Sequence, residues 1–130
     1  MKVAIIGAGN VGRALGTSIT RAGHDVTITS KHHENAVTAA RDIGATTAPS
    51  NADAVRGADV VILAVPFVGA GEAVAAEIRD AVAGKAVIDV TNPMKPDFSG
   101  LATTDGSAAE ELQKLLPEAS VVKAFNTIFA

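Results

Sequence analysis

Residues 2–12 read KVAIIGAGNVG, and this stretch decides the fold. Residues 3–6 form a short apolar run, which is the pattern of a strand buried on both faces. Gly7, Gly9 and Gly12 follow directly as G-x-G-x-x-G, and a helical pattern begins at once behind them. A strand, a glycine turn and a helix in this order are the context in which the motif indicates dinucleotide binding.

The three glycines of this turn each have a physical role in such a site. Gly7 permits the tight turn, Gly9 removes a side chain where a pyrophosphate must approach the backbone, and Gly12 lets the helix lie close to the strand. The N–H groups and the positive dipole end at the helix start then face the diphosphate. The alternative is a purely structural turn. The core-facing stripe of the helix is expected at Val11, Leu15, Ser18 or Ile19, and Ala22.

Composition limits the classes of protein to which the chain can belong. Its 130 residues suffice for one domain, and with 48% hydrophobic but only 3% aromatic residues the core must consist of Val, Ile, Leu and Ala. A formal charge of −3 without a basic run argues against nucleic acid as a partner. The chain has no Cys, and His24, His32 and His33 lack a third ligand at a suitable spacing, so we expect no metal site.

Hydropathy argues against a membrane partner. No apolar stretch approaches the roughly 18 residues that indicate a membrane span. Lys2 followed by a four-residue apolar run is not the pattern of a signal peptide. We therefore expect a cytoplasmic protein whose substrate is a small molecule.

Further apolar and β-branched runs predict five more strands. They lie over residues 25–29, 45–48, 59–65, 85–90 and 120–125. Helical patterns separate them, over 35–43 and 50–56, on the stripe of Val74, Ile78 and Val82, and after the capping box that begins at Ser107. This alternation predicts the α/β class and a doubly wound Rossmann fold over residues 1–130, with a six-stranded parallel sheet of order 3-2-1-4-5-6.

In this topology the carboxyl ends of all strands lie on one edge of the sheet, and the ligand crevice opens where strands one and four diverge. Asp89 is the one acid expected there, and no catalytic acid or base is assigned. The segments expected to line the cleft are the glycine turn (Gly7, Ala8, Gly9, Asn10, Val11 and Gly12), Ser30 and Lys31, Ala64 with Val65 and Pro66, Asn92, and Asn126 with Thr127.

The end of the second strand indicates which dinucleotide would bind. NAD-binding domains usually carry Asp or Glu there, which hydrogen-bonds the ribose. Here the position falls at Thr29 or Ser30, neither of which is acidic, and Lys31, His32 and His33 follow. A hydroxyl, a Lys and a protonated imidazole would attract a 2′-phosphate. We therefore expect NADP(H) in preference to NAD(H). A solvated basic loop is the alternative, and Glu34, one helical turn further on, is the local counter-argument.

Five segments together resemble a known family. KVAIIGAGNVGRALG (2–16), TSK (29–31), LAVPF (63–67), DVTNP (89–93) and VVKAFNT (121–127) are similar to the NADP oxidoreductase, coenzyme F420-dependent family. The same N-terminal domain is shared by pyrroline-5-carboxylate reductases, 3-hydroxyacid dehydrogenases and the cytosolic domain of a group of membrane metalloreductases. The joint occurrence of the last four segments is much more specific than the glycine turn alone.

The resemblance implies an NADPH-binding Rossmann domain that passes a hydride directly to the deazaflavin coenzyme F420, or in relatives to a flavin. It also implies roles for particular residues. The diphosphate would lie on Ala8, Gly9, Asn10 and Val11, the 2′-phosphate on Ser30 and Lys31, the cofactor beside Val65 and Pro66, and the nicotinamide toward Asn92, Asn126 and Thr127.

Two departures from the family pattern bear on this expectation. The family often has Arg at the position of Lys31, with a further basic residue near Asn35, so the grip on a 2′-phosphate could be weaker here. Relatives also continue beyond the segment that ends at Thr127, and we expect this chain to lack the part that closes the second-substrate pocket and often makes the dimer.

Two other functions stay open at this point. One is a non-catalytic nucleotide-sensing module, like the regulatory domains of potassium transport systems, although those usually carry an acid after the second strand. The other is the cofactor domain of an imine or hydroxyacid reductase. The sixth strand is an unprotected sheet edge and could pair in a homodimer.

Overall fold

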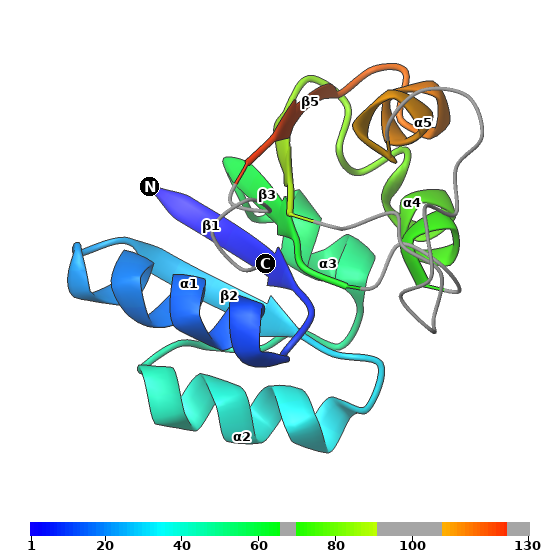
Figure 1. The fold of residues 1–130 in the computed structure, drawn as a ribbon. Helices are drawn as coiled ribbons and strands as arrows, with labels where there is room; N and C mark the ends of the chain where they lie inside the picture. Colours follow the sequence, from blue (N-terminus) through cyan, green and yellow to red (C-terminus); the bar gives the residue numbers. More distant parts are fainter. Residues whose placement is uncertain (66–69, 91–107, 125–130) are drawn as a thin grey trace, which may run out of the picture.

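The computed structural model describes residues 1–65, 70–90 and 108–124 of the chain. In these residues a parallel sheet of five strands has the order β2-β1-β3-β4-β5 (Figure 1). The strands are β1 (Lys2–Ile6), β2 (Asp25–Thr29), β3 (Val60–Leu63), β4 (Ala86–Asp89) and β5 (Ser120–Lys123). The helices are α1 (Asn10–Arg21), α2 (His33–Ile43), α3 (Asn51–Arg56), α4 (Glu72–Ile78) and α5 (Ala108–Leu115).

The prediction of a six-stranded sheet of order 3-2-1-4-5-6 is wrong, because the third predicted strand does not form. Residues 45–48 form only an isolated bridge, in which Thr46 pairs with Thr27 of β2. The N–H of Ala45 is still bonded to the Ala40 carbonyl at the end of α2, at 2.8 Å. Pro49 has no N–H to donate. In the described residues Thr46 alone of this segment pairs with β2, and the sheet has five strands.

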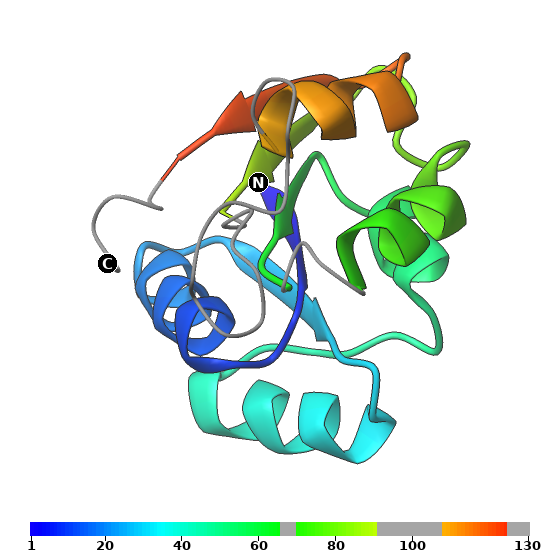
Figure 2. The same ribbon diagram turned by 45° about the vertical axis from the view of Figure 1, so that its right-hand side comes forward.

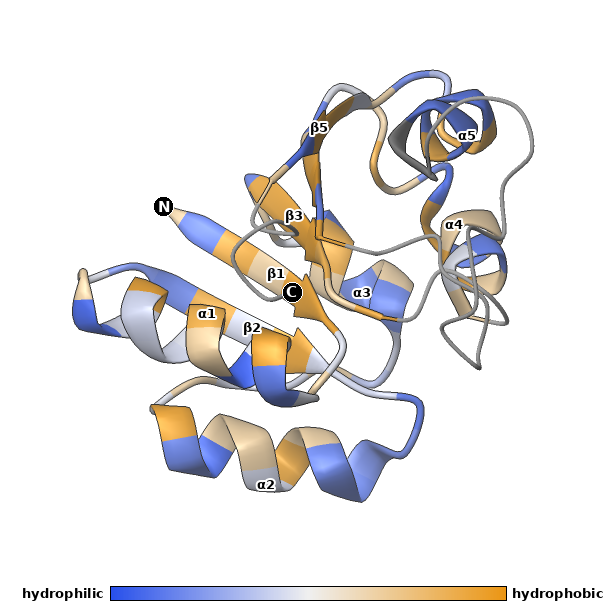
Figure 3. Cartoon of the chain, viewed as in Figure 1, coloured by the Kyte–Doolittle hydropathy of each residue, from blue (hydrophilic) through white to orange (hydrophobic). Residues whose placement is uncertain are grey.

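Helices cover both faces of the sheet, as expected for a doubly wound fold. Successive side chains of a strand point to opposite faces, so Val3 and Ile5 pack toward α1 and α2, whereas Ala4 and Ile6 pack toward α3, α4 and α5. The turned view in Figure 2 shows α5 over β4 and β5, away from α1 and α2. Figure 3 shows the hydrophobic colour along β1 and β3 in the middle of the sheet.

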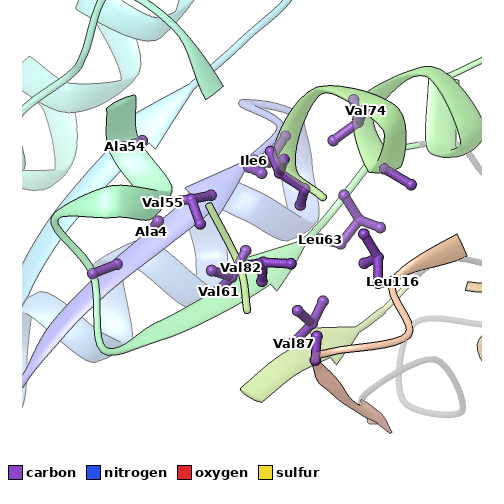
Figure 4. Packing of buried hydrophobic residues seen from close by; sticks show 14 of the residues in the cluster. Ala4, Ile6, Ala54, Val55, Val61, Leu63, Val74, Val82, Val87 and Leu116 are labelled. Carbon is purple, nitrogen blue, oxygen red and sulfur yellow. The ribbon is translucent and has the colours of Figure 1, made fainter. Parts of the chain in front are cut away.

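The larger core cluster is built from aliphatic side chains, as the composition predicts. Figure 4 shows Val61, Leu63 and Val87 of the strands facing Val74 and Leu116 of the helical layer. The predicted stripe of Val74, Ile78 and Val82 is buried throughout, although α4 itself ends at Ile78. None of the helices in the described residues combines the length and the hydropathy of a membrane-spanning segment.

The buried face of α1 includes Leu15 and Ile19 of the predicted stripe, which pack against the core, and two glycines that the prediction did not include. Leu15 and Ile19 are only partly buried, and the fully buried positions of the helix are Gly12 and Gly16. A β-carbon on Gly16 would lie 2.6 Å from Cδ1 of Ile43 in α2. A β-carbon on Gly12 would overlap the carbonyl oxygen of Gly7. Leu15 and Ile19 still pack against the core, and the two glycines let α1 lie close to the Gly7 carbonyl and to the Ile43 side chain.

Gly12→Ala should lower the free energy of unfolding by about 1–3 kcal/mol, because the new β-carbon meets a backbone carbonyl that cannot turn away. Gly57→Ala is the matched control, since its β-carbon would enter open space at a φ of −84°. We expect the control to change stability by less than about 0.5 kcal/mol. Urea unfolding followed by far-UV circular dichroism measures both, and equal losses would contradict the assigned contact.

Candidate functional site

A cleft of about 490 Å³ opens at the carboxyl edge of the sheet. It is lined by Gly7 after β1, by Ser30 and Lys31 after β2, and by Val65 after β3, with α3 and α4 on its far side. Four of the residues predicted to line the cleft are thus found there, whereas Ala8, Gly9, Asn10, Val11, Gly12 and Ala64 are not among its lining residues. A second cavity of about 440 Å³ lies at the opposite edge, around Lys2 and Asp25, away from the glycine turn.

Gly7 connects three strand ends. Its φ of +117° lies in the region that favours glycine. Its N–H donates to the carbonyl oxygen of Thr29 at 2.9 Å. A β-carbon at this position would overlap the carbonyl of Ala64, the residue after β3. The turn is therefore held against the ends of β2 and β3 by contacts that only glycine permits.

The start of α1 is open to an anion. Gly9 is the N-cap residue, no side chain caps the helix, and its first turn holds no acidic residue. A β-carbon on Gly9 would have no atom within 4 Å among the described residues. By contrast, the Ser50 hydroxyl caps α3 by accepting the Asp53 N–H at 3.1 Å. The unpartnered N–H groups of α1 therefore face open space, as phosphate binding requires.

Arg13 supports this turn, and sequence reasoning did not single it out. Its Nε donates to the carbonyl oxygen of Ala8 at 3.2 Å, inside the glycine turn. Its Nη1 lies 3.0 Å from Oδ2 of Asp42 near the end of α2. The guanidinium thus joins the turn to the helix beyond it. Its only sequence signal is a basic residue in the first turn of the helix after the motif.

The far wall of the cleft carries a chain of polar side chains that the sequence did not reveal. The buried Thr29 donates its hydroxyl proton to Oδ1 of Asn51 at 2.6 Å. Nδ2 of Asn51 donates to Oε2 of Glu77 in α4 at 2.8 Å. Thr29, Asn51 and Glu77 all line the cleft. Glu77 is therefore an acid in the cleft that sequence analysis missed.

The predicted phosphate-binding loop lies at the mouth of the cleft. Ser30 is half-buried and Lys31 is exposed, and both contribute to the lining. His32 is the N-cap residue of α2 and does not line the cleft, whereas its neighbour His33 does. The predictions for Pro66, Asn92, Asn126 and Thr127 fall outside the described residues.

Asp89, the one acid expected in the cleft, lies elsewhere on the same edge. It is fully buried at the end of β4 and is not among the residues that line the cleft. Its Oδ2 is 3.5 Å from Nζ of Lys123, its register partner at the end of β5. Among residues 1–65, 70–90 and 108–124, no group of three or more His, Asp or Glu could hold a metal ion.

A parallel sheet covered on both faces, whose first strand turns on glycines into an uncapped helix, defines a nucleotide-binding domain of the Rossmann type. The match to a protein family is more specific. Residues 2–93 fit the model of the family described as NADP oxidoreductase, coenzyme F420-dependent, and the chain belongs to that family.

Two curated relatives are named F420-dependent NADP reductase. The one from Methanothermobacter marburgensis is 36% identical over all of this chain and 65% of its own length, and the one from Methanothermobacter thermautotrophicus is 38% identical over all of this chain and 62% of its own. A solved structure from Arthrobacter sp. FB24, proposed to be an F420-dependent NADP reductase, superposes with a TM-score of 0.85 at 27% identity, over 98% of this chain and 63% of that one. The chain thus spans less than two thirds of the length of these relatives.

Thr29→Val should lower the free energy of unfolding by about 1–2 kcal/mol, because it removes the donor to Asn51 at a part-buried site without changing the volume much. Thr27→Val in the same strand is the control, since its hydroxyl lies 3.2 Å from that of Thr46 at an exposed site. We expect the free energy of unfolding of that control to stay within about 0.5 kcal/mol of the value for the unsubstituted chain. Thermal or urea unfolding measures both, and equal stability of the two variants would contradict the prediction.

Proposed function

We propose that the chain is the NADPH-binding domain of an oxidoreductase that moves a hydride between NADPH and coenzyme F420 or a flavin. The observation that carries the proposal is the open, uncapped start of α1 beside a strand end that bears Ser30 and Lys31 in place of an acid. The family membership of the chain and the names of its relatives support the same cofactor.

The residues present fit NADPH. Backbone N–H groups at the start of α1, after Gly9, would hold the diphosphate in the open space above the turn. The hydroxyl of Ser30 and the ammonium of Lys31 would hold the 2′-phosphate at the mouth of the cleft. Val65 and Val74 line the apolar part of the cleft and would contact the adenine ring.

The bound cofactor would supply a hydride at its nicotinamide ring. The described residues would act by binding and orientation, since direct transfer between two rings depends on their distance and alignment more than on a proton donor. Gly7 and Arg13 serve this purpose because both fix the turn against neighbouring elements. The chain spans under two thirds of its curated relatives, so the contacts to the hydride acceptor are a proposal for the whole protein.

NADPH should bind at least roughly tenfold more tightly than NADH, because a charge-assisted hydrogen bond contributes about 1.5–3 kcal/mol. Lys31→Asp should reverse that preference by repelling the 2′-phosphate. The same change at the exposed Lys114 of α5 is the control and should leave the preference intact. Nucleotide fluorescence measures the affinities, since the chain has no Trp or Tyr.

An NADH affinity equal to that for NADPH would refute the assignment of Ser30 and Lys31. Mixing the NADPH-loaded chain with F420 or with FMN then tests the hydride transfer, followed by the loss of NADPH absorbance. Loss of NADPH absorbance with either acceptor would support the enzyme, whereas tight NADPH binding without turnover by the whole protein would favour a nucleotide-sensing role.

Gly9→Asp should separate stability from binding. A carboxylate at the N-cap would accept hydrogen bonds from the free N–H groups of α1 and raise the free energy of unfolding by about 0.5–1 kcal/mol. The same carboxylate would occupy the diphosphate position and repel it, so NADPH affinity should fall by more than roughly tenfold. Gly9→Ala is the control without charge, and it should lose less NADPH affinity than Gly9→Asp does. A stabilised Asp variant that binds NADPH normally would show that the diphosphate lies elsewhere.

A further inference from the structure

The polar chain on the far wall ends in a carboxylate oxygen that is available to a ligand. Oε2 of Glu77 accepts a hydrogen bond from Nδ2 of Asn51 at 2.8 Å. In the part of the chain that the structure describes, Oε1 of the same carboxylate has no hydrogen-bond partner. Glu77 lines the cleft at the side opposite the glycine turn. The carboxylate is therefore held on one side and open on the other.

We propose that Glu77 reads the exocyclic amino group of adenine, and that Asn51 positions it to do so. The inference rests on the proposed binding of NADPH. It goes further by assigning base specificity to the far wall of the cleft, whereas Ser30 and Lys31 would select the phosphate.

The shape and polarity of the cleft support an inserted purine. Val65 and Val74 supply apolar contacts, and the small side chains of Ala70 and Ala73 leave room for a flat ring. A nucleotide whose ribose lies at the mouth, near Ser30, would direct the six-membered edge of its base away from the sugar and toward α3 and α4. Glu77 lies on that far side.

Hydrogen-bond chemistry makes the carboxylate selective. An ionised carboxylate only accepts hydrogen bonds. Adenine presents an amino donor at its 6-position, whereas hypoxanthine and guanine present an oxygen acceptor. Glu77 would therefore bond adenine and repel a 6-oxopurine. Glu77 is exposed in the empty cleft. A purine that packs beside it would exclude water from the carboxylate, so a 6-oxopurine would leave this polar group without a partner and bind less tightly.

Asn51 is fixed by its contact with β2. The hydroxyl of Thr29 donates to Oδ1 of Asn51 at 2.6 Å, which turns Nδ2 toward Glu77. Thr29 is the last residue of β2 and directly precedes Ser30. The strand end that presents the predicted phosphate ligands therefore also orients, through Asn51, the carboxylate on the opposite wall.

The test compares NADPH with its hypoxanthine analogue, reduced nicotinamide hypoxanthine dinucleotide phosphate, by fluorescence titration of the full chain. We expect the unsubstituted chain to prefer NADPH by roughly tenfold. Glu77→Gln should bring the two affinities within about twofold, since the amide donates to the 6-oxygen as readily as it accepts from the amine. Glu72→Gln is the control on the same helix, because Glu72 is exposed and does not line the cleft.

Asn51→Ala tests the positioning role. The variant keeps the carboxylate and should still lose most of the discrimination between the two bases, with the 2′-phosphate preference for NADPH over NADH retained. Unchanged discrimination in Glu77→Gln, or an equal loss of affinity for both nucleotides, would overturn the assignment and leave the proposed function standing. Failure of the unsubstituted chain to bind NADPH at all would overturn both.

Discussion

Two backbone contacts that leave no room for a β-carbon set the geometry of the nucleotide-binding edge. Gly7 lies against the carbonyl of Ala64, and Gly12 lies against the carbonyl of Gly7. Since Ile6 and Leu63 are register partners in β1 and β3, the turn cannot move without sliding one central strand past the other. The open start of α1 is therefore held as rigidly as the sheet itself, which preorganises it for an anion.

Most of the sheet could be predicted because each strand is a short apolar run with a clear stop. The predicted third strand failed because residues 45–48 follow the α2 cap at Gly44 and precede Pro49, so that only Thr46 pairs. The prediction of the buried face of α1 was incomplete for a different reason. Hydrophobic periodicity locates side chains that fill space, whereas Gly12 is buried against the backbone carbonyl of Gly7 and Gly16 against the side chain of Ile43.

The side of the cleft formed by the glycine turn and by Ser30 and Lys31 could be predicted, whereas the far wall on α3 and α4 could not. Ser30 and Lys31 directly follow a recognisable strand, and the topology then brings them to the glycine turn. Thr29, Asn51 and Glu77 are separated by 22 and 26 residues, and no spacing rule connects them. Their hydrogen bonds depend on how α3 and α4 pack beside β2, which is settled by tertiary packing rather than by local pattern.

The three glycines of the turn are subject to different physical constraints. Gly7 and Gly12 are favoured by neighbouring backbone atoms, so replacing either costs stability whether or not the protein binds a nucleotide. A β-carbon on Gly9 would meet nothing within 4 Å in the described protein, so space for a ligand is the constraint that favours glycine there. In a lineage that gave up its cofactor, the middle glycine would drift first, and its identity would then record whether the site is still in use.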